Sequence, residues 1–424
     1  MDILWITNIP VGRSVELMDR PQKYISGTWL DAALSDFIND GDFRVTIVTV
    51  TKTNAIKMIS DGNINYCLLP GGGPDSYDIS DQSNFKSWKY IQNTFRPDII
   101  HVWGTEFKHG YLALKAMKGL PSVVYMQGVL AAISRYYRAG MTPHELRSNI
   151  TFRDIIRRDW IVRKQRNLAK NALIEAEMLH ISNNVIVENK WCTSYCKSIN
   201  PGVKVHQCNL NIRHSFFQAG WKFESAGSYT ILCNAGGYPI KGLHVLIRAL
   251  KIVSKRFPTV QLMIPGEQSP FSKGLVHSIK ENGYTRFIKK LIIELDLINN
   301  IQYLGPLDSS QMAERMSTAN VFVMSSCIEN HSSTLMEAMI VGTPCIAAYA
   351  GGVPEYLHHQ ENGLLYRFEE HEMLAEHICD LFSDPQRAIS LGTMASKTMR
   401  ASRLAQDHKG RLVEIYRKVI GSEK

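Results

Sequence analysis

The sequence has few cysteines at paired spacing and no long apolar run. Eight cysteines are spread thinly over 424 residues, and the one close pair, Cys192 and Cys196, has no second pair at zinc-site spacing. We therefore expect reduced thiols. No stretch reaches the roughly 18 uninterrupted apolar residues of a membrane span. The first ten residues, MDILWITNIP, carry Asp2 where a signal peptide needs positive charge. These absences predict a cytoplasmic protein.

A glycine-rich dinucleotide fingerprint is also missing after the first predicted strand. Oxidoreductases that bind NAD place G-x-G-x-x-G there, so that the backbone can approach a pyrophosphate. Residues 5–16, WITNIPVGRSVE, contain only Gly12. This argues against a nicotinamide-dependent oxidoreductase, and we expect no bound cofactor. The fourteen histidines have no acidic or cysteine partners at ligand spacing, so we also expect no metal.

What the sequence does contain is an ordinary globular composition, with 45% hydrophobic and 21% charged residues. Short apolar runs alternate with amphipathic helical patterns from end to end, which is typical of parallel sheets covered by helices. The chain is too long for one core, so we expect two doubly wound α/β domains. Periodicity lapses over residues 213–228. We therefore expect an N-terminal domain over 1–215, a C-terminal domain over 216–400, and a last helix in 401–424 that packs on either domain.

The net charge of +9 favours phosphates, nucleic acid or an anionic lipid surface as partners. Part of the excess lies in residues 147–170, where eight Lys and Arg residues face two Asp residues. Apolar residues interleave with these charges, which predicts one basic amphipathic helix. Two interpretations stay open: the helix contacts the inner face of an anionic membrane, or its apolar stripe packs on its own domain.

Two glutamates eight positions apart mark the candidate site. VFVMSS, residues 321–326, reads as a strand, and the helix that follows begins at Ser332 or Ser333 and ends at Gly342. Glu329 therefore lies beyond the carboxyl edge of a parallel strand, where doubly wound sheets bind ligands. The helix start, with hydroxyl side chains from Ser332, Ser333 and Thr334, suits a diphosphate. Glu329 is placed to accept hydroxyls of a sugar, and Glu337 those of a ribose.

A lysine completes this arrangement. Lys241 follows the predicted strand 229–235 and opens a helix, so its ammonium group reaches the same sheet edge. There it would stabilise the charge that develops on a leaving diphosphate. The residues together predict a nucleotide-sugar site.

These motifs resemble those of the retaining glycosyltransferases of family four. The resemblance lies in PIKGLHVLIRAL (239–250), ENHSSTLMEAMIVGTPCIA (329–347), GGVPEYL (351–357) and, more weakly, RPDIIHVWG (96–104). It implies the GT-B fold, two facing Rossmann-like domains with a cleft between them. It also implies a donor held mainly by the second domain, no required metal, and transfer with retention at the anomeric carbon.

The resemblance assigns roles to particular residues. It implies that Lys241 contacts the diphosphate, Glu329 the sugar and Glu337 the ribose, that Ser332, Ser333 and Thr334 form the phosphate-binding helix start, and that Gly351 and Gly352 form a second glycine turn. The sequence departs from the family at three places. Gly236 or Ala235 stands where an arginine is common, Gln127 stands where many members carry a histidine, and Gly27 alone stands where paired glycines are common. We expect Gly27 on the donor side and Gln127 on the acceptor side.

The resulting hypothesis is a glycosyltransferase that moves a sugar from a UDP- or GDP-linked donor to a glycan or lipid-linked acceptor, in surface polysaccharide or glycolipid biosynthesis. The leaving phosphate would take the acceptor proton while Lys241 and the helix start hold its charge. Two alternatives remain. A nucleotide-sugar epimerase would share the donor site. A basic nucleic-acid-binding protein would spread its charge across the chain, whereas here much of it gathers in 147–170, so no nucleic acid is expected.

Overall fold

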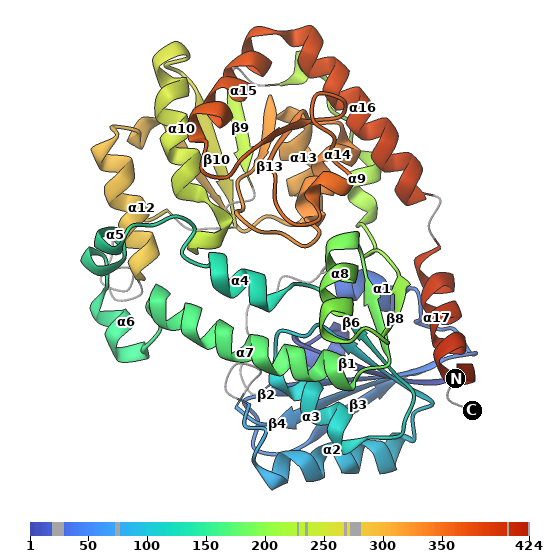
Figure 1. Ribbon diagram of the computed structural model, residues 1–424. Helices are drawn as coiled ribbons and strands as arrows, with labels where there is room; N and C mark the ends of the chain where they lie inside the picture. Colours follow the sequence, from blue (N-terminus) through green and yellow to red (C-terminus); the bar gives the residue numbers. More distant parts are fainter. Residues whose placement is uncertain are drawn as a thin grey trace. The chain divides into compact units, whose positions relative to one another are not determined.

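The computed structural model describes residues 1–18, 29–72, 77–226, 229–233, 236–266, 269–271, 281–404 and 407–422. The chain divides into two compact units (Figure 1). Unit 1 comprises Met1–Ala131, Leu168–Asn211 and Gln406–Lys424, and unit 2 comprises Ala132–Asn167 and Ile212–Ala405. Each unit is described by itself below.

Unit 1 is built on an eight-stranded sheet within the described residues, in the order β3-β4-β2-β1-β5-β6-β7-β8. The strands are β1 Asp2–Thr7, β2 Arg44–Thr51, β3 Lys57–Asp61, β4 Ile64–Pro70, β5 Ile99–Trp103, β6 Ser122–Tyr125, β7 Asn184–Val187 and β8 Lys204–Gln207. Neighbours pair in parallel except β3, which joins β4 as an antiparallel hairpin. The sequence had not predicted β3, although Gly62 and Asn63, the two residues between β3 and β4, are a hairpin signal.

Helices cover both faces of this sheet, and each face has its own apolar core. Trp5, Ile47 and Trp103 lie in the core on one face, and Leu4, Val48 and Val102 in the core on the other. Neighbouring strand residues thus alternate between the two cores, as a sheet buried on both faces requires. The helices are η1 Gly12–Leu17, α1 Trp29–Ser35, α2 Gln82–Phe95, α3 Lys108–Ala116, α8 Lys190–Ile199 and α17 His408–Ser422, with α4 Leu130–Tyr136 and α7 Ile161–Ile181 crossing the limits of the unit.

Unit 2 has a parallel six-stranded sheet within the described residues, in the order β11-β10-β9-β12-β13-β14. The strands are β9 Thr230–Cys233, β10 Gln261–Pro265, β11 Ile301–Gly305, β12 Val321–Met324, β13 Cys345–Ala348 and β14 Leu364–Tyr366. β9 and β12 overlap the strands expected at 229–235 and 321–326. The two units are therefore both doubly wound α/β structures, as predicted.

Two cores again sandwich the sheet of unit 2. One lies under α10, α12 and α15, and the other under α9, α13, α14 and α16. The helices are α5 Pro143–Ser148, α6 Phe152–Arg157, α9 His214–Gln218, η3 Phe223–Ser225, η4 Pro239–Lys241, α10 Leu243–Arg256, α12 Gly283–Glu294, η5 Ile298–Asn300, α13 Ser309–Thr318, α14 Ser333–Val341, η6 Val353–Glu355, α15 His371–Ser383 and α16 Pro385–Leu404.

The units differ from the expected domain limits in two ways. Residues 132–167 group with unit 2, whereas the expected first domain ran without interruption over 1–215. The chain also enters unit 2 at Ile212, so that the expected hinge segment 213–228 lies inside this unit, apart from 227 and 228, which are outside the described residues. The last helix, α17, is part of unit 1, where Leu412, Ile415 and Tyr416 are buried.

The expectation of one basic helix over 147–170 is wrong. The segment holds the end of α5, all of α6 and the start of α7, because Arg158 turns the chain with a positive φ of 51° between α6 and α7. The apolar residues consequently separate. Ile161 and Val162 of α7 pack against the unit 2 core, whereas Ile155 and Ile156 of α6 are exposed.

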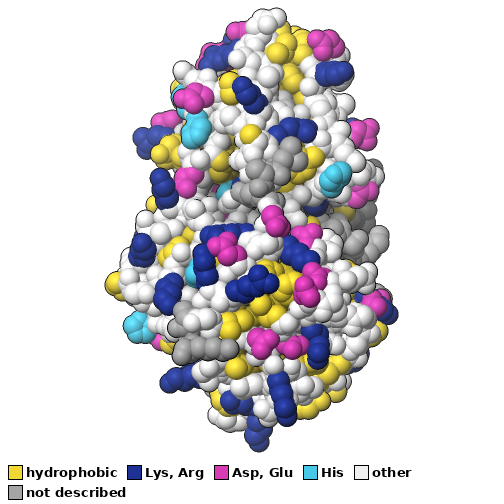
Figure 2. Space-filling view, turned by 90° about the vertical axis from the view of Figure 1, so that its right-hand side faces the viewer, with side chains coloured by type: hydrophobic (Ala, Val, Ile, Leu, Met, Phe, Trp, Pro, Cys, Tyr) yellow, Lys and Arg dark blue, Asp and Glu magenta, His cyan; other side chains and the backbone are white. Residues whose placement is uncertain are grey.

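Two further observations concern the surface. None of the helices in the described residues is long and apolar enough to cross a membrane. On the face that Figure 2 shows, Lys and Arg side chains are interspersed with Asp and Glu side chains, so that no single-sign patch covers it.

Candidate functional site

The topology of unit 2 creates a ligand-binding edge next to β9 and β12. The chain runs from β9 outward to β10 and β11, and then returns to place β12 on the other side of β9. The loops after β9 and β12 consequently leave the sheet in opposite directions, which opens a crevice at its carboxyl edge. The Lys241 turn follows β9, and Glu329 follows β12.

A glycine fixes the position of Lys241. The lysine lies in the short helix η4, just before α10, rather than opening α10 itself as expected. Gly242 follows with φ +71°, and a Cβ on it would lie 1.9 Å from the Ser325 carbonyl oxygen. The Ser325 hydroxyl donates to the Lys241 carbonyl oxygen at 2.9 Å. The backbone of Lys241 and Gly242 thus packs directly against Ser325, the residue that follows β12.

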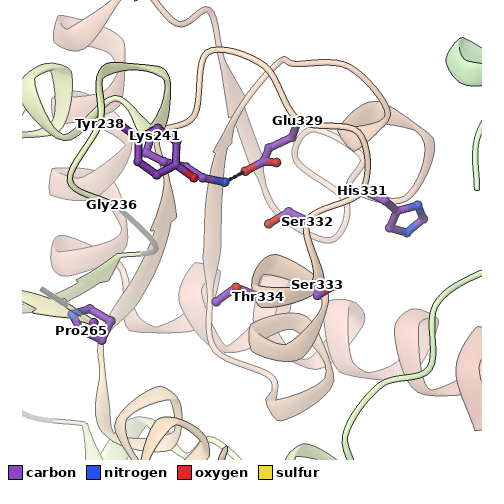
Figure 3. Close-up of a pocket in the computed structure, with 10 residues that line it drawn as sticks. Gly236, Tyr238, Lys241, Pro265, Glu329, His331, Ser332, Ser333 and Thr334 are labelled. Carbon is purple, nitrogen blue, oxygen red and sulfur yellow. Dashed lines mark hydrogen bonds and ion pairs between the residues drawn. The ribbon is translucent and has the colours of Figure 1, made fainter. Parts of the chain in front are cut away.

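Lys241 and Glu329 form an ion pair over a cavity of about 410 Å³ (Figure 3). Lys241 Nζ lies 2.5 Å from Glu329 Oε1, and the Ser326 hydroxyl donates to the same oxygen at 2.9 Å. Burial alone would lower the pKa of Lys241, but the Glu329 carboxylate outweighs it and the pKa is raised. The lysine therefore carries a full positive charge at the cavity.

The start of α14 forms another wall of this cavity. Ser332 is its N-cap, and its hydroxyl accepts the Leu335 N–H at 3.4 Å. Because the first N–H groups of a helix have no intrahelical partner, this end attracts anions. The cavity is lined by Gly236, Tyr238, Lys241, Pro265, Gly266, Glu329, His331, Ser332, Ser333 and Thr334. Of these ten lining residues, Lys241 is the one with a Lys or Arg side chain.

Glu337 lies one turn into α14 but is not among the residues that line the cavity. Its side chain is buried and accepts two hydrogen bonds at Oε1 from Arg213, 2.8 Å from Nη2 and 3.0 Å from Nε. Its Oε2 is also buried and has no hydrogen-bond partner in the described part of the chain. Burial raises the pKa of Glu337 to about 7, against the opposing charge of Arg213. Arg213 thus holds one carboxylate oxygen, and the buried second oxygen keeps its capacity to accept a hydrogen bond.

The sequence did not predict Arg213 as a site residue. It lies just before α9, in the segment expected to be a hinge, and nothing in its own spacing marks a site. Its guanidinium also stands over the Phe216 ring, 4.9 Å from the centroid. Only the fold brings it to Glu337, 124 positions away in the sequence.

The glycine turn lies against the backbone of Glu329. The Gly352 N–H donates to the Glu329 carbonyl oxygen at 3.2 Å. Gly351 has φ +52°, a conformation that favours glycine. The structure thus brings Lys241, Glu329, the α14 start and the glycine turn together at one edge of the unit 2 sheet.

Gln127 lies at the corresponding edge of unit 1, after β6. A Cβ on Gly104, after β5, would meet Glu106 Oε2 at 2.2 Å, Asn8 Nδ2 at 2.4 Å and Gln127 Cδ at 3.2 Å. Asn8 also donates to Glu106 Oε2 at 3.0 Å. Three loops thus place polar side chains around one glycine. The sequence predicted Gln127 as an acceptor-side residue but did not predict Asn8 or Glu106.

A buried carboxylate holds two of these loops in place. Glu175 of α7 accepts hydrogen bonds from the Thr105 hydroxyl at 2.6 Å, the Leu130 N–H at 3.0 Å and the Tyr195 hydroxyl at 2.9 Å. Burial raises the pKa of Glu175 to about 8. Thr105 precedes Glu106, and Leu130 follows the loop of Gln127, so Glu175 positions both.

Two expectations are not resolved by this geometry. Gly27, expected on the donor side, lies outside the described residues, as does Ala235. Within the described residues, no three His, Cys, Asp or Glu side chains gather closely enough to hold a metal ion.

Comparison with known proteins finds a family match in unit 2. Residues 221–398 match the family model described as Glycosyl transferases group 1. This match lies within unit 2. A D-inositol 3-phosphate glycosyltransferase of Streptomyces avermitilis is 27% identical over 161 residues, 38% of this chain. The chain spans about a third of the length of that relative, 33%.

Solved structures resemble this chain over its full length. Sucrose-phosphate synthase of Thermosynechococcus elongatus has a TM-score of 0.72 at 17% identity, with 99% of both chains covered. The Anabaena protein HepE, in complex with UDP-glucose, has a TM-score of 0.62 at 16% identity and covers 100% of this chain and 99% of its own. At these identities the likeness concerns the fold alone. The predicted GT-B class, two doubly wound parallel-sheet units, is confirmed.

Proposed function

We propose that the protein is a retaining glycosyltransferase that moves a sugar from a nucleotide-sugar donor to a glycan or lipid-linked acceptor. One observation carries the proposal: the Lys241–Glu329 ion pair and the start of α14 line the same cavity at the carboxyl edge of the unit 2 sheet. A cation, a helix N-terminus and a carboxylate at one site are what a sugar diphosphate requires.

The roles follow from the positions of the charges. Lys241 and the N–H groups at the start of α14 bind the diphosphate and stabilise the negative charge that it gains as the glycosidic bond to it breaks. Glu329 then accepts hydrogen bonds from hydroxyls of the sugar. Glu337 Oε2 accepts those of the ribose, while Arg213 holds Oε1. The departing phosphate oxygen takes the acceptor proton, so that transfer occurs on one face with retention.

The relatives support the substrate class. The Streptomyces avermitilis protein is a glycosyltransferase by name, and HepE was solved with UDP-glucose. We propose a UDP- or GDP-linked donor and a role in surface polysaccharide or glycolipid biosynthesis. Gln127, with Asn8 and Glu106, is our proposed acceptor side. The proposal assigns the diphosphate charge to Lys241 and the helix start rather than to a divalent cation, and activity is expected to survive a chelator.

A thermal-shift panel of UDP- and GDP-sugars tests the donor. A donor at about 100 times its Kd should stabilise the protein by about 2.7 kcal/mol. Glu337→Gln removes the ribose carboxylate and should abolish the shift, whereas Glu372→Gln, which alters a largely exposed carboxylate (68%), should retain it. A panel without any shift would exclude this site as a nucleotide-sugar site. Epimerised donor formed in the absence of acceptor would instead support an epimerase.

A further inference from the structure

The short helix α6 carries three large apolar side chains that face solvent. Phe152 is 77% exposed, Ile155 58% and Ile156 66%. Their spacing of i, i+3 and i+4 puts them on one side of the helix, the pattern that normally packs on a protein core. Such a contiguous apolar face on a surface helix is a mark of an interaction site.

The opposite side of α6 is fixed to unit 2. Asp154 is 2% exposed and forms a capping box with Thr151, with hydrogen bonds of 3.0 and 3.1 Å. The start of α12 packs here: a Cβ on Gly283 would lie 2.9 Å from Asp154 Oδ2. Arg286 of α12 donates to the Ile150 carbonyl oxygen at 3.2 Å. The apolar face is therefore held outward by a firmly anchored backbone.

The surroundings of this face are basic. The nearby acids are engaged in ion pairs: Arg153 contacts both Asp154 and Asp159 at 3.2 Å, and Arg248 contacts Glu145 at 2.8 Å. These acids therefore do little to offset the outward-facing cations. Two cations that remain exposed, Arg157 and Arg158, lie at the end of α6 itself.

We propose that α6 docks on an anionic lipid surface, with Phe152, Ile155 and Ile156 inserted at the headgroup boundary and Arg157 and Arg158 on lipid phosphates. We name these three residues the α6 face. Exposed apolar side chains next to two exposed arginines match an interfacial element, which combines buried apolar area with attraction to anionic lipid. One helix of this size gives reversible binding.

The charges favour lipid over other partners. Two copies of the chain docked through the α6 face would bring arginines against arginines, which is unfavourable. A single-stranded nucleic acid binds through aromatic side chains on which bases stack, and the α6 face offers only Phe152. The inference does not rest on the proposed transferase activity, because it uses no residue of the donor site.

Vesicle sedimentation of the full chain tests this inference without any nucleotide sugar. The protein should sediment with vesicles of equal parts phosphatidylglycerol and phosphatidylcholine, but not with phosphatidylcholine alone, and added salt should release it. The variant Phe152→Ser/Ile155→Ser/Ile156→Ser should lower the partition coefficient by roughly tenfold or more. Arg157→Glu/Arg158→Glu should also lower the partition coefficient. The size of this decrease should become smaller as salt is added.

Matched controls separate the α6 face from general hydrophobicity. Ile293→Ser and Ile298→Ser remove apolar side chains that are 52% and 51% exposed elsewhere on unit 2, and should leave the partition coefficient unchanged. All variants should keep the wild-type melting temperature, since the changed side chains are exposed.

Two results would overturn the inference. The wild type could fail to sediment with anionic vesicles, or the triple variant could sediment as well as the wild type. In the second case, loss of a wild-type dimer in gel filtration, or loss of bound RNA, in the triple variant would assign the α6 face to that partner instead. A failed donor panel with intact vesicle binding would reject the proposed function alone.

Discussion

Lys241 Nζ and Glu329 Oε1 lie 2.5 Å apart, although the two residues are 88 positions apart in the sequence. Each residue offsets the charge of the other. A bound diphosphate would offer Lys241 a second anionic partner, and sugar hydroxyls would offer Glu329 donors. The pair therefore links the two ends of the proposed donor.

Replacing either member of the pair should slow transfer. Lys241→Met and Glu329→Gln should each lower the turnover rate by about 100- to 1000-fold, because each removes charge or hydrogen bonding at the leaving group or sugar. Initial rates at saturating donor measure the effect. Lys255→Met, an exposed lysine of α10, is the control. Rates near wild type for both site variants would contradict these roles.

The glycine after Lys241 should be irreplaceable for a steric reason. Gly242→Ala places a methyl group 1.9 Å from the Ser325 carbonyl oxygen, in addition to the strain of φ +71°. Gly305 has φ +70° and no atom within 4 Å of an added Cβ, so Gly305→Ala isolates the strain, about 1–2 kcal/mol. Urea unfolding should show a clearly larger loss for Gly242→Ala. Equal losses would show that the contact with β12 is not rigid.

Donor affinity should depend on pH through Glu337. Its folded-state pKa is raised from 4.5 to about 7, so protonation below about 7 removes the carboxylate that accepts ribose hydroxyls. The Kd for donor should rise by roughly tenfold per pH unit well below 7. Titration calorimetry at about pH 6 and about pH 8 measures it. Glu337→Gln should bind weakly at both pH values; an unchanged pH dependence in that variant would assign the effect to another group.

The stability of the ligand-free protein should change in the opposite direction. Because the folded pKa of Glu337 lies above its ordinary value, this group favours the fold at pH below about 4.5, and that contribution is lost as the pH rises through about 7. The difference in unfolding free energy between wild type and Glu337→Gln should therefore change between these values. Denaturant unfolding across this range checks the sign.

Tyr416 should be important for the stability of unit 1. Its buried hydroxyl lies 2.6 Å from His101 Nδ1 and accepts the Trp5 indole N–H at 3.1 Å. The same hydroxyl thus pairs with both side chains, and the tautomer of His101 sets which atom of the His101–Tyr416 hydrogen bond is the donor. Tyr416→Phe leaves both partners buried without it and should cost about 1–3 kcal/mol. Tyr90→Phe, at a half-exposed tyrosine of α2, should cost almost nothing; equal effects in urea unfolding would contradict this account.

Local patterns in the sequence predicted the sheets and part of the site. The strands are short apolar runs closed by turn residues, and both ends of α14 are marked by Ser332 and Gly342, so residues next to each other in sequence carried the information. Lys241, Glu329 and the α14 start could be grouped because parallel strands end at one edge.

Other features depend on contacts between distant segments. Arg213 meets Glu337 only through the packing of α9 beside α14, and Glu175 joins loops of β5 and β6 from the far end of α7. The single helix expected over 147–170 failed because Arg158 adopts a left-handed conformation, which periodicity alone does not reveal. The sequence marks Ile155 and Ile156 as apolar residues among charges, but the exposure of Ile155, Ile156 and Phe152 depends on the fold.

The place of α17 has a consequence for synthesis on the ribosome. Unit 1 is completed by Tyr416 and its neighbours, which are translated after the whole of unit 2. The side chains of Trp5 and Trp103 are therefore incompletely buried during synthesis. They remain so while some three hundred residues are added after Trp103. Nascent chains released before residue 408 should be bound by chaperones through this incomplete first unit, whereas the core of unit 2 is already closed.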